Sequence, residues 1–247
     1  MVIAEPGVGL VDKMGIPKMN TFKFALPAMA LALVVVGGAA QAEDKLAVAY
    51  NIGVQSNYEF RGISQTDKNA SLFGGADATY GKFYAGTWLS NVEFHNGTSI
   101  EYDFYAGFKP QAGPVALDLG VIYYGYGNKP SGADEAYTEV KVAGSVPVGK
   151  ATVGAAVYYS PEFPFKTGEA TYYEVNGSVP LNDKWSVSGA LGHQDVVGPA
   201  DYTTWNVGLG YALNSKVGLD LRYWDTDEHN FGRIFDSRLV LGIKATF

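Results

Sequence analysis

The sequence predicts an all-β protein, a closed antiparallel transmembrane β-barrel of about 12 strands. The first observation is the chain end: residues 237–247 alternate between apolar and polar side chains and stop on Phe247. Alternate residues of a strand point to opposite faces. The closing strand of an outer-membrane barrel shows its apolar side chains to lipid and carries aromatic residues at the interface.

The second observation is the start of the chain. Three lysines precede an apolar stretch at residues 24–36, which Ala40-Gln41-Ala42 follows. This pattern predicts a signal peptide over residues 1–42, with the barrel formed by residues 43–247. A membrane anchor is disfavoured because the apolar stretch is shorter than the roughly 20 residues that a spanning helix needs. Translation could start at Met14 or Met19, since residues 1–17 have no evident role.

Composition excludes several classes of protein. Residues 43–247 hold 15 Lys/Arg and 23 Asp/Glu, a net charge of −8, which argues against nucleic acid as a partner. The chain has no cysteine, so it has no disulfide framework and no thiolate nucleophile or metal ligand. No cofactor is expected.

The third observation is a series of alternating segments of about ten residues, the weak signature of a membrane barrel. In the clearest of them, Val115, Leu117, Leu119 and Val121 share one face and Asp118 lies on the other. The predicted strands are 46–60, 70–80, 83–92, 100–108, 115–125, 137–146, 152–160, 172–179, 185–193, 203–211, 217–225 and 237–247.

The connections between these strands alternate in length. Short turns are expected at 81–82, 110–114, 147–150, 180–184 and 212–216. Longer polar loops are expected at 62–69, 95–99, 127–136, 161–169, 194–202 and 226–235. This asymmetry matches short periplasmic turns and longer extracellular loops, with both termini in the periplasm.

Aromatic residues are expected in two belts at the strand ends, as lipid interfaces favour. A soluble sandwich with scattered core aromatics is the alternative, but it explains neither the signal peptide nor the terminal phenylalanine. The belt residues are Tyr58, Phe60, Tyr123, Tyr159, Tyr173 and Tyr223 near the long loops, and Tyr80, Phe108, Trp185, Tyr211 and Phe247 near the short turns.

By strand parity, eight acids and five bases point into the lumen. Placing Arg or Lys on the lipid side near the midplane would cost about 2–4 kcal/mol each, which supports this choice of faces. The predicted lumen or pore-lining residues are Glu59, Arg61, Asp77, Glu101, Asp103, Asp118, Glu139, Lys141, Glu174, Asp220, Arg222, Arg238 and Lys244.

Two interpretations of these charges remain open. The acids and bases could pair and plug the lumen, or they could line a water-filled path, since twelve strands lie between filled and open barrels. Small inward residues such as Gly107, Gly120 and Gly208 leave space and favour a narrow pore. The acid excess would then favour cations or polar neutral solutes.

An enzyme is the rival class, because some twelve-stranded barrels are lipid hydrolases. The histidines, His95, His193 and His229, lie in or beside predicted loops, and no Gly-x-Ser-x-Gly or His-Glu-x-x-His motif occurs. The sequence therefore predicts that the protein is not an enzyme.

Four stretches, 56–66, 83–94, 101–107 and 120–126, resemble the TorF-type porins, a bacterial family long catalogued as of unknown function. They read SNYEFRGISQT, FYAGTWLSNVEF, EYDFYAG and GVIYYGY. The resemblance is specific over residues 56–126 and looser afterwards. It implies an outer-membrane barrel and a porin, and it brings no substrate and no catalytic residues.

Within the first of these stretches, Arg61 and Gly62 lie where the first predicted strand meets the first long loop. Arg61 is expected to pair with an inward acid such as Glu59, Glu101 or Asp103. It could act at the pore mouth or fasten the loop to the wall, and the second role is slightly favoured.

The predicted function is therefore passive diffusion of small polar solutes or ions through the bacterial outer membrane, which the chain reaches by export through the periplasm. The alternative is a closed structural or surface-binding barrel. Expected partners are outer-membrane lipid, the solutes, and the barrel-assembly machinery acting on the strand that ends at Phe247.

Overall fold

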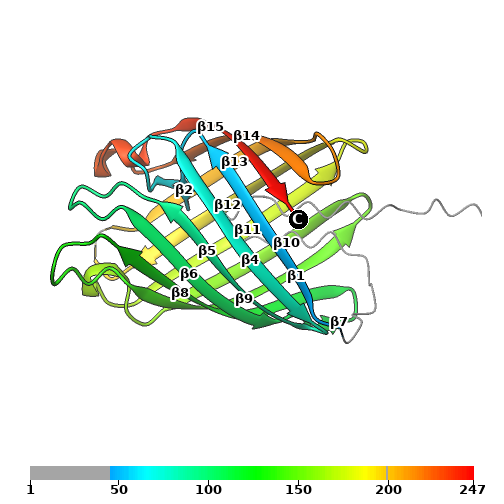
Figure 1. Cartoon of the computed structure of the whole chain (residues 1–247), viewed down its shortest axis with the longest axis horizontal. Helices are drawn as coiled ribbons and strands as arrows, with labels where there is room; N and C mark the ends of the chain where they lie inside the picture. Colours follow the sequence, from blue (N-terminus) through cyan, green and yellow to red (C-terminus); the bar gives the residue numbers. More distant parts are fainter. Residues whose placement is uncertain (1–44, 199) are drawn as a thin grey trace, which may run out of the picture.

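The computed structural model describes residues 45–198 and 200–247, so the predicted signal peptide lies outside the described residues. Twelve strands form the wall of the barrel (Figure 1). They are β1 (Ala47–Gln55), β4 (Ser71–Tyr80), β5 (Phe83–Asn91), β6 (Ile100–Phe108), β8 (Val115–Gly127), β9 (Tyr137–Val148), β10 (Ala151–Ser160), β11 (Ala170–Pro180), β12 (Trp185–Val196), β13 (Tyr202–Ala212), β14 (Val217–Thr226) and β15 (Arg238–Thr246).

The wall closes on itself. Each wall strand pairs antiparallel with its neighbours along the chain, and β1 pairs with β15 in the register Asn51↔Thr246 to Gln55↔Gly242. The short strand β7 (Gln111–Ala112) pairs with β8 inside the connection between β6 and β8. The predicted closed antiparallel barrel of 12 strands is confirmed.

The connections also alternate as predicted. The short turns lie at one end of the barrel and the long loops at the other (Figure 1). Short 3-10 turns occur in two of the long loops, as η2 (Pro164–Lys166), η3 (His229–Phe231) and η4 (Arg233–Phe235). Within the described residues, no helix has the length and apolar character needed to cross a membrane.

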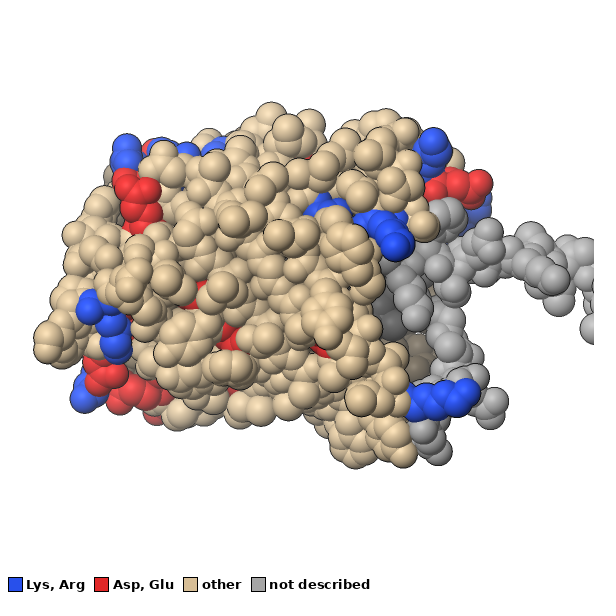
Figure 2. All heavy atoms as spheres, in the orientation of Figure 1, with Lys and Arg blue, Asp and Glu red and all other residues tan. Residues whose placement is uncertain are grey.

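The outer face of the wall is apolar. Outward side chains such as Val140, Val142, Leu239 and Leu241 are at least half exposed, and the residues between them in the sequence point inward. In Figure 2, most charged residues of the visible face lie toward the two ends, with a largely uncharged band between them. This distribution fits a wall surrounded by hydrocarbon.

The outer band predicts a depth-dependent cost for a charge. Val142→Arg, near the middle of β9, should destabilise the folded barrel by about 2–4 kcal/mol, whereas Val148→Arg, at the end of the same strand, should cost about 0–1 kcal/mol. Urea unfolding of both variants in lipid vesicles measures this. Equal costs at the two positions would show that lipid does not cover the band.

The first strand differs from the prediction. The wall strand β1 ends at Gln55, so the predicted strand over 46–60 is wrong beyond residue 55. The chain then turns inward and forms a small hairpin of β2 (Glu59–Phe60) and β3 (Ile63–Ser64). A signal for this break was present, because Ser56 is a polar residue at a position where parity requires a lipid-facing side chain.

The inward turn also changes the aromatic belts. Tyr58 is only 2% exposed and Phe60 packs edge-on against Tyr124, so neither belongs to a belt at the lipid interface. Other predicted belt residues are exposed at the two ends of the wall, including Tyr123, Tyr159 and Tyr173 near the long loops and Tyr80, Trp185 and Phe247 near the short turns.

Candidate functional site

The candidate site is the lumen at the long-loop end, where the first loop, L1 (residues 56–70), folds into the barrel. The Tyr58 hydroxyl donates a hydrogen bond of 2.5 Å to Glu101 on β6. Gly62 lies directly against Thr204 of β13 and Thr226 of β14. L1 therefore reaches across the lumen from β6 to β13 and β14.

An apolar and aromatic core fills this end of the lumen around L1. Tyr58 packs edge-on against Trp88, and Tyr124 stacks on Tyr137 with ring centroids 4.4 Å apart. The buried members of the core are Tyr58, Phe73, Trp88, Val92, Ile122, Tyr124, Tyr126, Tyr137, Ala156, Tyr158 and Tyr172. This core lies inside the barrel, behind the wall strands.

Arg61 makes the strongest contacts between L1 and the wall. Its guanidinium donates to both carboxylate oxygens of Glu139, at 2.8 and 2.7 Å, and to Gln194 Oε1 at 3.0 Å. The guanidinium carbon also lies over the rings of Tyr158 and Tyr172, at 4.9 and 4.3 Å from their centroids. A bidentate charge-assisted pair combined with cation–π contacts holds a buried cation firmly.

The expected partners of Arg61 were wrong. Glu59, Glu101 and Asp103 lie inside the barrel, but Arg61 pairs with Glu139 on β9. The cause is the path of the backbone: Arg61 adopts a left-handed conformation (φ +50°) in the turn between β2 and β3, away from the wall strand assumed for it.

A second ion pair joins L1 to the last wall strand. Glu59 is fully buried and accepts a hydrogen bond of 2.6 Å from Arg238, which also donates to the backbone oxygens of Ile234 and Asp236. Asn57 donates to the same carboxylate oxygen of Glu59. Glu59 is therefore an inward residue of the loop and not of a wall strand.

Two further ion pairs lie within the wall itself. Lys141 is 2.7 Å from Asp118, which also accepts a hydrogen bond from Tyr84. Arg222 pairs with Asp220 at 3.0 Å. The Arg222 guanidinium additionally donates to Asn206 Oδ1 and Ser188 Oγ, so neighbouring strands are cross-linked through the lumen face.

Four of the predicted inward acids have no salt bridge among the described residues, and three of them have hydrogen-bonding partners. Asp77 accepts from Tyr105 at 2.6 Å, Glu174 from Tyr172 and Asn176, and Glu101 from Tyr58. Asp103 Oδ1 is buried without a hydrogen bond. Lys244 is partly buried and has no salt bridge within the described part. A role for these residues in lining a pore stays a prediction.

The inward glycines do not leave open space, as the sequence had suggested. A Cβ atom at Gly107 would lie 2.4 Å from the Tyr84 ring, and one at Gly208 would lie 2.5 Å from the Arg222 guanidinium. Large neighbouring side chains lie over these glycines. The glycines therefore make room for the polar network and not for solute.

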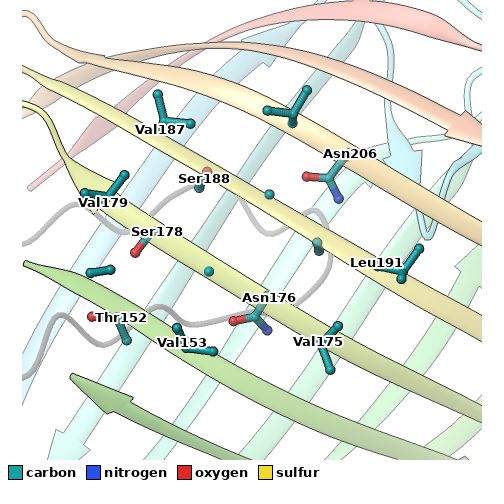
Figure 3. Close-up of a pocket in the computed structure, with 15 residues that line it drawn as sticks. Thr152, Val153, Val175, Asn176, Ser178, Val179, Val187, Ser188, Leu191 and Asn206 are labelled. Carbon is teal, nitrogen blue, oxygen red and sulfur yellow. The ribbon is translucent and has the colours of Figure 1, made fainter. Parts of the chain in front are cut away.

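The hollow in Figure 3 lies on the outer wall rather than in the lumen. It has a volume of about 500 Å³ and lies over strands β10 to β13, where Gly177 pairs with Gly189. Exposed outward side chains, Val153, Val175 and Leu191, surround it. It belongs to the apolar band and offers no path for a polar solute.

Exposed ion pairs connect L1 to the last loop, L6 (residues 227–237). Arg233 pairs with Asp67, and Lys68 pairs with Asp236 at 2.8 Å. The hydrogen bond from Arg233 holds the pKa of Asp67 below its usual 3.8, and the hydrogen bond from Lys68 does the same for Asp236.

These pairs predict looser attachment of L1 in acid. The pKa of each carboxyl is lowered when its ion pair is formed. The stabilisation that each pair gives to the attachment of L1 is therefore complete above about pH 4 and disappears as the pH falls further through the lowered pKa. Opening steps of the reconstituted protein should become more frequent as the pH on the loop side falls from about 6 to about 3. The Asp67→Asn/Asp236→Asn variant should open often already at about pH 6. If its opening frequency still rises as the pH falls, the two ion pairs are not the cause of the pH dependence.

Sequence reasoning missed the wall residues that hold Arg61, above all Gln194, Tyr158 and Tyr172. They are uncharged, so a search for inward charges passes over them. For Tyr158 and Tyr172 the available signal was their inward parity on β10 and β11, whereas Gln194 was assigned to the predicted loop 194–202 because β12 is longer than the predicted strand.

Comparison with known proteins gives a family and a fold. The model of a family described as "Bacterial protein of unknown function (Gcw_chp)" matches residues 39–247. No curated protein matches the chain in sequence.

Several solved structures are similar. A KdgM porin is 12% identical with a TM-score of 0.56, covering 81% of this chain and 98% of that one. A NanC porin is 9% identical with a TM-score of 0.55, covering 81% and 99%. An outer-membrane channel from Pseudomonas putida F1 is 11% identical with a TM-score of 0.52, covering 86% and 100%. These likenesses show that the chain shares the barrel fold of outer-membrane porins.

Proposed function

The chain belongs to the Gcw_chp family of bacterial proteins of unknown function, and we propose that it is a porin-like channel of the bacterial outer membrane. It passes small polar solutes or ions by passive diffusion and is not an enzyme. One observation carries the proposal: a closed barrel of twelve strands has an apolar outer band and a charged, polar inner face. A wall of this kind places water-compatible groups along a path through lipid.

L1 lies across the lumen of this channel and is joined to the wall through Tyr58 and Arg61. Conduction therefore requires L1 to shift or solutes to pass beside it. The resemblance of residues 56–126 to the TorF-type porins agrees with the proposal. So does the exposed Phe247 at the end of the chain, which we propose as the feature that the barrel-assembly machinery recognises.

We further propose a preference for cations. Arg61, Lys141, Arg222 and Arg238 are each neutralised by an acid. Asp77, Glu101, Asp103 and Glu174 have no such partner among the described residues, whereas Lys244 is the one predicted inward base there without a salt bridge, so acidic groups are in excess on the inner face. Acidic linings favour cations over anions.

Planar-bilayer recording of the purified protein tests both statements. Discrete conductance steps are expected, and in a salt gradient the reversal potential should have the sign of cation selectivity. A reversal potential of the opposite sign would contradict the cation preference alone. No conductance steps, in the wild type or in a variant with L1 displaced, would contradict the channel.

The second candidate is a closed barrel with a structural or surface-binding role. The observation that favours it is that L1 and the aromatic core around it fill the lumen at the long-loop end. The two candidates differ in the effect of displacing L1: a channel conducts more, whereas a structural barrel only loses stability.

A further inference from the structure

The surroundings of Arg61 form a recognition site for its guanidinium group, to which L1 itself adds only the ring of Phe60, 4.7 Å from the guanidinium carbon. Five consecutive wall strands, β8 to β12, each contribute one side chain to it. Glu139 and Gln194 accept the hydrogen bonds of the guanidinium, Tyr158 and Tyr172 lie against its face, and Tyr124 donates a hydrogen bond of 3.1 Å to Glu139.

All five of these side chains belong to the barrel wall, whereas Arg61 belongs to L1. The wall strands are joined by continuous ladders of backbone hydrogen bonds from β8 to β12, so the backbone that carries the five side chains is fixed independently of L1. L1 is held mainly by side-chain contacts and by the exposed ion pairs to L6, with backbone hydrogen bonds to its surroundings from Ser56 to Leu241 and from Glu93 to Gln65. Withdrawal of L1 would leave the wall site empty and intact.

We propose that this wall site binds the guanidinium group of a small solute and that Arg61 is its internal occupant. The proposal rests on the proposed channel function and adds the class of solute: small molecules that carry a guanidinium group. Such a solute competes with Arg61 for the site, and its binding favours the arrangement in which L1 no longer closes the lumen.

The chemistry of the site distinguishes a guanidinium from other solutes. The two oxygens of Glu139 accept two parallel N–H bonds, a match for a planar fork that a spherical cation or an ammonium cannot make. The tyrosine faces favour a flat cation over a neutral solute. The carboxylate of Glu139 repels anions.

Calorimetric titration of the detergent-solubilised protein with methylguanidinium tests the proposal. Arg61→Ala should bind one equivalent saturably, and wild type should bind at least about tenfold more weakly because Arg61 fills the site. Adding Glu139→Gln to Arg61→Ala should weaken binding by about tenfold or more, since the bidentate charged pair is lost. Methylammonium, with the same charge but no planar fork, should bind Arg61→Ala more weakly than methylguanidinium.

Absence of saturable binding to Arg61→Ala would overturn the proposal, and so would equal affinity for methylammonium or an unchanged affinity after Glu139→Gln. Heat-modifiable migration on gels establishes that each variant is a folded barrel. Gly62→Ala leaves every wall residue of the site in place and provides the same test if Arg61→Ala does not fold: it should bind methylguanidinium more tightly than wild type. Calorimetry needs no conduction, so a failure of the channel proposal is recognised separately, by the absence of conductance.

Discussion

Gly62→Ala is expected to displace L1 from the lumen and to increase the open-channel conductance. A Cβ at this position would lie 2.2 Å from Thr204 Oγ1 and 2.9 Å from Thr226 Cγ2, and the backbone has a φ of +82°. The left-handed conformation costs an alanine about 1–2 kcal/mol, and the steric overlap adds about 1–3 kcal/mol. Single-channel recording should show larger or more frequent openings than in wild type.

Gly132→Ala is the matched control for this variant. Its φ of +84° is almost the same, but nothing lies within 4 Å of the added Cβ. The control therefore carries the backbone strain without the overlap, and its conductance should stay that of wild type. Equal conductance of the two variants would show that Gly62 does not seat L1 against the wall.

Lys141→Met is expected to destabilise the barrel by about 3–5 kcal/mol, because it leaves a nearly buried carboxylate without its cation. The Lys141 ammonium is 2.7 Å from Asp118 and its side chain is 2% exposed. Methionine fills a similar volume, so the change removes mainly the charge. Urea unfolding of the protein in lipid vesicles measures the loss.

The double variant Lys141→Met/Asp118→Asn distinguishes an unpaired charge from lost packing. Asparagine still accepts the hydrogen bond from Tyr84 but carries no charge, so most of the lost stability should return. A double variant that is as unstable as Lys141→Met, or less stable, would show that the stability lost in the single variant does not come from the unpaired Asp118.

The barrel wall could be predicted from the sequence because its determinants are local. Alternation along a strand such as β15 follows from the side-chain period of two, and the difference between turns and loops follows from the residues between strands. The predicted strand over 100–108 coincides with β6. Strand ends elsewhere differ by a few residues.

The filling of the lumen could not be predicted in the same way, because it depends on contacts between distant residues. Arg61 and Glu139 are 78 positions apart, and the sequence offers several inward acids of equal chemistry. The choice among them is made by the turn between β2 and β3 and by the tyrosines that surround the guanidinium. The inward glycines were misjudged for a similar reason: whether a glycine leaves space depends on the neighbour that lies over it.

The central claim is that lipid contacts one face of the wall while the other face lines a polar lumen. The chain has no cysteine, so single cysteines can be introduced into β15 and spin-labelled in lipid vesicles. Labels at 239, 241 and 243 should be accessible to oxygen dissolved in the lipid, and labels at 242 and 244 should not. Oxygen accessibility that does not alternate along β15 would contradict the account. A water-soluble nickel reagent that reaches the labels at 239, 241 and 243 as readily as oxygen does would also contradict it.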